Sequence, residues 1–279
     1  MKQLSSLEYP VSLLVQMHLD RINLIHSVVD ADAIYILGTD TCQLTRQSFC
    51  STNDYKKTYT DHLLILVLIP HLHDGTLLAY QEKIEQKCND LGTTTAIVLE
   101  TGTFKYWLSV GHLFAQKVIQ TTSPIYSVAH FSVSTSIPVD SFVLERISDT
   151  TYKDGLIKSQ EFYAGAELFL IRKQHKLCLF MLHQATEQAL STMVKIGMGY
   201  YCCSHNIERL LRYASWVSYS VVELFMNKSE KDKKRFKLMQ QAYIDSRYKA
   251  DFSVDYKDLI ILTEKVSDLI KLLTGFQFK

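Results

Sequence analysis

The ten residues MLHQATEQAL, from Met181 to Leu190, lie inside a longer stretch, 177–195, whose apolar residues recur at three- and four-residue steps. That period is typical of an α-helix with one face in a core. His183 and Glu187 are four residues apart, so a helix places them on the same face. This polar pair in an otherwise apolar helix marks a candidate site.

Helical periodicity continues on both sides of this stretch, and no proline follows residue 150. Residues 132–149 instead mix Ser, Thr and Val with Pro138 and show no helical period, which predicts a connector and a domain boundary near residue 150. We therefore expect an all-α bundle over residues 151–279. Four other helices are predicted. They cover 153–175, a short stretch that begins at Ile207, a stretch that ends near Arg247, and 256–273.

The first 150 residues have a different pattern. One helix is expected over 11–29, and three β-branched or aromatic runs predict strands at 33–37, 63–69 and 94–99. The amphipathic stretch 77–91 separates the last two strands, and the run 63–69 is apolar throughout, as in a strand buried on both faces. Strand, helix and strand in that order predict an α/β domain over 1–150.

Composition restricts the classes of function. The chain has 279 residues, which favours two domains, and its formal net charge is +1, so no global field favours DNA and any polyanion site must be local. Residues 1–10 do not resemble a signal peptide, and the longest apolar run, 63–70, is too short for a membrane span. We therefore expect a cytoplasmic location and no membrane contact.

The cysteines show no paired C-x-x-C spacing, so we expect reduced thiols. Cys202, Cys203 and His205 form half of a possible zinc motif, but no second cluster supplies the remaining ligands. No metal and no cofactor are predicted.

Three segments of the second half resemble HEPN domains. Besides residues 181–190, the run 204–211 (SHNIERLL) resembles the short element that opens the family's third helix, and 242–248 (AYIDSRY) resembles its Y-x-x-A-R-Y stretch. The resemblance implies a helical bundle, an association with nucleotides or RNA, and a homodimer formed through this domain.

The same resemblance places Glu187, His205 and Arg247 near one another. A structural alternative is an ion pair that locks the bundle, with His205 capping a helix. A ligand site would be a basic and aromatic pocket that holds a phosphate. The candidate ligand-binding residues are Arg247, Tyr248, Glu187, His205, His183 and Arg172.

Many HEPN domains that cut RNA carry an arginine followed four to six residues later by a histidine. Here no histidine follows Arg247. Because acid–base cleavage needs a group that titrates near neutrality close to the phosphate, we expect no catalytic residue at this position.

The first half resembles the small nucleotidyltransferase-like domain that accompanies HEPN domains. Gly38, Thr39 and Asp40 are similar to its phosphate-binding turn, and 111–119 is similar to one of its helices. The resemblance puts Thr60 and His62 where active members carry two metal-binding carboxylates. We therefore expect a degenerate domain with a mixed sheet and only a remnant of the phosphate turn.

Three readings follow. The first is a non-catalytic nucleotide- or RNA-binding regulatory protein, for which the resemblance implies a toxin–antitoxin-like origin. The second is a ribonuclease or nucleotidyltransferase with an atypical active site. The third is an interaction scaffold, because the apolar residues of 259–273 exceed one helical stripe.

Overall fold

The computed structural model describes residues 11–46, 55–72, 75–133, 141–225, 229–249 and 252–276. Side chains are described at 19–40, 62–72, 75–133, 149–225, 229–246, 249 and 252–276. The chain divides into two compact units, residues 1–137 and 138–279.

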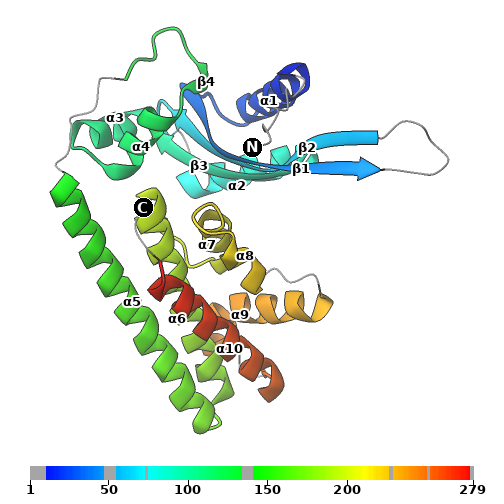
Figure 1. Cartoon of the computed structure of the whole chain (residues 1–279), viewed down its shortest axis with the longest axis vertical. Helices are drawn as coiled ribbons and strands as arrows, with labels where there is room; N and C mark the ends of the chain where they lie inside the picture. The colour runs from blue at the N-terminus through cyan, green and yellow to red at the C-terminus, as the bar shows by residue number, and fades with distance from the viewer. Residues whose placement is uncertain are drawn as a thin grey trace, which may run out of the picture. The chain divides into compact units, whose positions relative to one another are not determined.

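The N-terminal unit is an α/β unit with a mixed four-stranded sheet in the order β3-β2-β1-β4 (Figure 1). β1 pairs antiparallel with β2 and β4, whereas β2 and β3 are parallel. The element order is α1 (Val11–His26), β1 (Ala33–Arg46), β2 (Tyr55–Ile69), α2 (Leu77–Cys88), η1 (Asn89–Leu91), β3 (Thr93–Glu100), α3 (Thr101–Ser109), α4 (Leu113–Thr121) and β4 (Pro124–Ser127). The predicted α/β class is confirmed.

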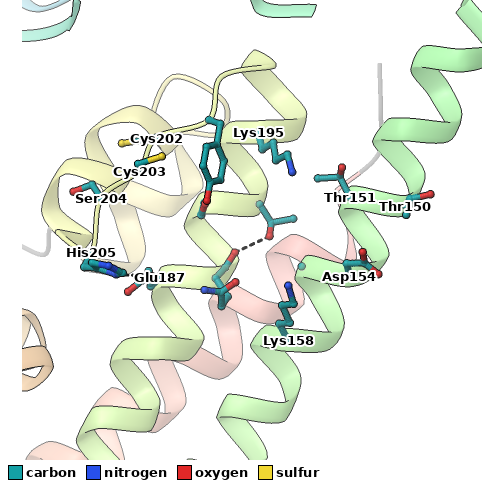
Figure 2. Close-up of a pocket in the computed structure, with 15 residues that line it drawn as sticks. Thr150, Thr151, Asp154, Lys158, Glu187, Lys195, Cys202, Cys203, Ser204 and His205 are labelled. Atoms are coloured by element: carbon teal, nitrogen blue, oxygen red, sulfur yellow. Dashed lines mark hydrogen bonds and ion pairs between the residues drawn. The ribbon is translucent and has the colours of Figure 1, made fainter. Parts of the chain in front are cut away.

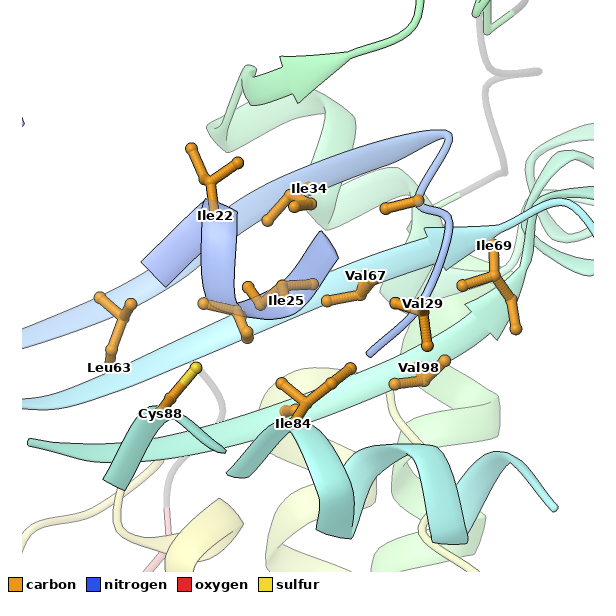
Figure 3. Packing of buried hydrophobic residues seen from close by; sticks show 13 residues of the cluster. Ile22, Ile25, Val29, Ile34, Leu63, Val67, Ile69, Ile84, Cys88 and Val98 are labelled. Carbon is orange, nitrogen blue, oxygen red and sulfur yellow. The ribbon is translucent and has the colours of Figure 1, made fainter. Parts of the chain in front are cut away.

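Alternating strand residues build a core on each face of this sheet. Every residue from Leu63 to Ile69 is buried, as expected of a strand covered on both sides. On one face, Ile25 of α1 and Ile84 of α2 join a cluster with Leu63, Val67 and Val98 (Figure 3). On the other face, the Phe104 ring of α3 lies 6.3 Å from the Tyr35 ring.

The residues predicted to keep a remnant of a phosphate-binding turn lie in a strand instead. Gly38, Thr39 and Asp40 continue β1 and pair with Leu64, Leu63 and His62 of β2. An irregular step between Ile36 and Gly38 accommodates one extra residue and lets the strand continue beyond Leu37. Because these residues extend a strand, no loop curls there to hold a phosphate.

The C-terminal unit is a helical bundle around α6. Its elements are α5 (Ser141–Ile171), α6 (His175–Met198), α7 (Ile207–Ala214), α8 (Ser220–Phe225), α9 (Glu230–Tyr248) and α10 (Tyr256–Thr274). α6 packs against α5, α7, α9 and α10, and α5 and α6 form a long helical hairpin (Figure 1). The predicted bundle is confirmed.

Two features of this bundle differ from the sequence prediction. α5 begins at Ser141, within the stretch predicted to be a connector, and the units divide before Pro138 rather than near residue 150. On α10, Leu259, Leu262, Val266, Ile270 and Leu273 are buried in the bundle, and Ile260 is half-buried.

Among the described residues, no helix combines the length and apolar character needed to cross a membrane.

Candidate functional site

A pocket of about 400 Å³ opens between α5, α6 and the segment 199–206 that joins α6 to α7 (Figure 2). All of its lining residues belong to the C-terminal unit. They are Thr150, Thr151, Asp154, Gly155, Lys158, Glu187, Gln188, Ser191, Thr192, Lys195, Tyr201, Cys202, Cys203, Ser204 and His205. The site is therefore built from two neighbouring helices and one connecting segment.

One end of this pocket is cationic. Lys158 of α5 and Lys195 of α6 direct their ammonium groups into the space between the two helices (Figure 2). The Lys195 ammonium lies 5.5 Å from the centroid of the Tyr201 ring. Within the described residues, neither lysine is seen in an ion pair, although the Asp154 carboxylate, one turn from Lys158 on α5, lines the same pocket.

Hydroxyl groups surround the lysines, supplied by Thr150, Thr151 and Ser191. Thr192 donates its hydroxyl hydrogen to the Gln188 carbonyl at 2.7 Å, which fixes its side chain against α6. α5 approaches so closely that a Cβ atom at Gly155 would overlap the Thr192 side chain. The small residue at 155 brings the two helices, and hence their lysines, together.

The other end of the pocket contains a carboxylate held by two imidazoles. Glu187 Oε1 lies 3.1 Å from Nδ1 of His205, and Oε2 lies 3.5 Å from Nε2 of His183. The Gln184 amide also donates to Oε2, at 3.4 Å. The sequence prediction that Glu187 and His205 lie close together agrees with this geometry.

Burial alone would raise the pKa of the Glu187 carboxyl. The two imidazoles that face its oxygens, His183 and His205, outweigh that cost and lower the pKa of the Glu187 carboxyl below its ordinary value. Glu187 is consequently an anion at neutral pH.

The two histidines differ in accessibility. The His183 side chain is fully buried, and its Nδ1 donates to the Met239 carbonyl at 3.0 Å, because a carbonyl oxygen can only accept. The His205 side chain is 63% exposed and stacks on Tyr243, with ring centroids 4.7 Å apart. Only His205 can therefore meet a ligand directly.

Three further residues were predicted to bind a ligand, namely Arg172, Arg247 and Tyr248. Arg172 is exposed in the turn after α5, roughly 20 Å further along the helix axis than Lys158, and does not line this pocket, so its role in another ligand site stays a prediction. Arg247 and Tyr248 lie on α9, but their side chains are outside the described part of the chain. Their role stays a prediction.

Sequence reasoning missed Lys158 and Lys195. Each is an ordinary exposed lysine on an amphipathic helix, and only the pairing of α5 with α6 puts both at one pocket. A faint signal exists in Gly155, since a glycine inside a helix often marks close packing against a neighbour.

In the N-terminal unit, the polar groups around the sheet are engaged in structural contacts. Nε2 of His62 lies 2.7 Å from the Thr95 hydroxyl, Glu100 accepts from the Leu72 amide at 2.9 Å, and Asp32 accepts from the Thr101 hydroxyl at 2.6 Å. The side chains of Thr60 and Asp61 lie outside the described residues. In the described part of the chain, no group of three or more His, Cys, Asp or Glu residues is arranged to hold a metal ion.

Comparison with known proteins finds a family match within the helical unit. The HEPN domain family matches residues 152–274. No curated protein matches the chain. A crystal structure of a nucleotidyltransferase-like protein from Exiguobacterium sibiricum is 9% identical, with a TM-score of 0.29, and the match covers 93% of this chain and 75% of that chain. A similarity that distant carries no conclusion about function.

Proposed function

Because residues 152–274 match the HEPN domain family, we propose that this protein is a non-catalytic regulatory protein whose α5–α6 pocket binds the phosphate of a nucleotide or of an RNA end. A toxin–antitoxin-like origin, with the α/β unit as a degenerate nucleotidyltransferase-like partner, belongs to the same proposal. So does a homodimer formed through the HEPN domain.

The observation that carries the proposal is the meeting of Lys158 and Lys195 at one pocket. Two ammonium groups with neighbouring hydroxyls suit the oxygens of a phosphate, which accept charge-assisted hydrogen bonds. The pocket volume of about 400 Å³ lies within the usual range for small-molecule sites. Tyr201, which is 59% exposed at the same pocket, offers a ring on which a base can stack.

The chemistry of the opposite end favours binding over cleavage. Glu187 has a lowered pKa, so it is a poor proton acceptor and holds no proton to donate at neutral pH. His183 is buried and donates to a carbonyl. These two groups hold His205 and the 199–206 segment in place.

Titration calorimetry with ADP and with a short oligoribonucleotide tests the proposal, comparing 5′-phosphate and 5′-hydroxyl forms of the RNA. The phosphorylated ligands should bind, and Lys158→Gln or Lys195→Gln should weaken binding about tenfold, the worth of one charge-assisted hydrogen bond. The same lysine variants should leave the thermal midpoint of the free protein nearly unchanged.

Lys153→Gln is the matched control. Lys153 is also an exposed α5 lysine, but it pairs with Asp149 at 2.7 Å and does not line the pocket. Its substitution removes the same charge and should not change affinity. Equal losses from all three variants would reduce the effect to general electrostatics, and no binding of any phosphorylated ligand would refute the proposal.

A second candidate function, RNA cleavage, is favoured by one contact. His205 is exposed and its Nδ1 lies on the Glu187 carboxylate, an arrangement that orients an imidazole for general acid–base catalysis. Cleavage of RNA that is lost in His205→Ala and kept in His130→Ala, an exposed histidine of the other unit, would establish this function. Intact RNA after prolonged incubation would exclude cleavage, and phosphate binding would remain as the proposed function.

The homodimer is supported by exposed apolar residues on α5, among them Ile157, Leu168 and Ile171, which are 55%, 53% and 79% exposed. Their burial against a second chain would be favourable. Sedimentation of the wild type and of Leu168→Lys with Ile171→Lys tests this point, since the charged variant should be a monomer.

A further inference from the structure

The mouth of the pocket carries two adjacent cysteines, Cys202 and Cys203, that the proposed phosphate site does not use. Neither cysteine is in a disulfide, and both line the pocket. They lie on the segment 199–206, which is neither helix nor strand, between Gly199 that ends α6 and Asn206 that caps α7.

These thiols differ from the other described cysteines in accessibility. Cys203 is exposed and Cys202 is half-buried, whereas Cys88 and Cys178 are fully buried. Burial raises the pKa of both buried thiols to about 11, which leaves almost no thiolate at neutral pH. Of the described cysteines, only the adjacent pair can react readily with a solute.

We propose that Cys202 and Cys203 are a reversible oxidation site, which forms a disulfide by exchange with a small-molecule disulfide such as oxidised glutathione and thereby reshapes the mouth of the pocket. The proposal does not depend on which ligand the pocket holds.

The exchange takes two steps. The Cys203 thiolate, as the more exposed sulfur, attacks one sulfur of the oxidant, breaks its S–S bond and releases one reduced thiol, leaving a mixed disulfide on Cys203. The Cys202 thiolate then attacks the Cys203 sulfur and displaces the second reduced thiol. The pair loses two protons and two electrons, and one disulfide becomes two thiols.

Adjacency makes this disulfide easy to reduce. Consecutive Cα atoms are about 3.8 Å apart, shorter than the roughly 4.4–6.8 Å that an unstrained disulfide spans. The resulting strain raises the reduction potential of the disulfide, as in labile regulatory disulfides rather than in structural ones.

Oxidation of the two cysteines should change the position of the His205 side chain. The Ser204 amide donates to the Cys202 carbonyl at 3.0 Å, so the backbone already turns tightly around Cys203. A ring that joins the two sulfurs must alter this turn, and His205 follows two residues later with its Nδ1 on Glu187. The disulfide should therefore displace the exposed imidazole from its carboxylate.

The test equilibrates the full-length protein with mixtures of oxidised and reduced glutathione, traps free thiols by alkylation and maps tryptic peptides by mass spectrometry. Cleavage after Lys195 and Arg209 gives a peptide, 196–209, with Cys202, Cys203 and no other cysteine. This peptide should lose two hydrogens under oxidising mixtures and regain them with dithiothreitol, while peptide 177–195, with the buried Cys178, should stay reduced in the same digest.

Two variants identify the order of steps. Cys202→Ser should accumulate a stable glutathione adduct on Cys203, because the resolving thiol is gone. Cys203→Ser should react several-fold more slowly, since only the less exposed thiol remains. A persistent adduct on the wild-type peptide, or no change in its mass, overturns the oxidation site.

The effect on the pocket has its own readout. The imidazole resonances of His205 should shift on oxidation of the wild type and stay unchanged in the doubly substituted Cys202→Ser, Cys203→Ser protein under the same mixtures. Unchanged resonances in a protein whose peptide 196–209 is oxidised would refute the coupling to the pocket.

Discussion

Glu187 and His205, 18 residues apart in the sequence, meet with Oε1 of the carboxylate 3.1 Å from Nδ1 of the imidazole. The contact joins the middle of α6 to the end of the segment that leads into α7. Because Glu187 is only 7% exposed while the His205 side chain is largely in solvent, a buried anion positions an accessible ring. The same contact serves the stability of the bundle and the shape of the site.

Glu187→Gln should destabilise the bundle at neutral pH by about 1–3 kcal/mol, because the buried His183 loses an anionic partner. The folded-state pKa of Glu187 is lowered, so its contribution is complete above the unfolded value of 4.5 and is lost as the pH falls through the folded value. Urea unfolding of both proteins should show a gap in unfolding free energy at neutral pH that shrinks as the pH falls below 4.5 and closes once the carboxyl is protonated in the folded protein. A gap that is constant across this range would exclude the carboxylate charge as its cause.

Gly155→Ala should destabilise the protein by about 1–3 kcal/mol, because the new methyl group overlaps the Thr192 side chain. Gly165→Ala is the matched control on the same helix, where the added Cβ would lie 3.6 Å from the Met181 sulfur, an ordinary contact. That control should stabilise the protein by about 0.5–1 kcal/mol through helix propensity. Thermal unfolding of both variants should give shifts of opposite sign; shifts of the same sign would contradict the close approach of α5 and α6.

Asn206→Ala should cost about 1 kcal/mol, because the Asn206 side chain caps α7 by accepting from the Arg209 amide at 3.0 Å. Asn206→Asp keeps an acceptor and should retain most of the stability. Chemical denaturation measures both variants. If alanine and aspartate cost the same, the cap does not determine where α7 begins.

Among the four cysteines whose side chains are described, alkylation with iodoacetamide at neutral pH should label Cys203 first, then Cys202, and leave Cys88 and Cys178 unlabelled until urea is added. Burial raises the pKa of the two protected thiols to about 11, and neither sulfur is accessible. Peptide mapping over a time course gives the order. Early labelling of Cys178 in native buffer would show that α6 opens far more readily than its packing implies.

Much of the fold could be predicted from local pattern. The continuous apolar run in β2 and the spacing of His183 and Glu187 on α6 each report a burial that the structure reproduces. Hydrophobic periodicity in the sequence arises because one face of an element is buried, so these elements could be predicted without knowledge of their neighbours. The HEPN-like segments added the proximity of His205 to Glu187, which no local spacing contains.

The missed features depend on contacts between distant residues. Pro138 and the Ser- and Thr-rich stretch concealed the first turns of α5, and Thr39 and Asp40 are exposed residues that pairing with β2 keeps extended. Lys158 and Lys195 share a pocket only through the register of the α5–α6 hairpin. Registers of this kind are set by tertiary packing, which single-residue propensities do not describe.

The start of α5 at Ser141 determines how the bundle can be isolated. The HEPN match begins at residue 152, so a recombinant fragment cut at that boundary would lack the first part of α5 together with Thr150 and Thr151, two residues of the pocket wall. It would also begin inside a helix, with the new first turn deprived of its preceding residues. A fragment intended for ligand screening or crystallisation should therefore begin before Ser141, and one that begins at residue 152 should bind phosphate ligands more weakly even if it folds.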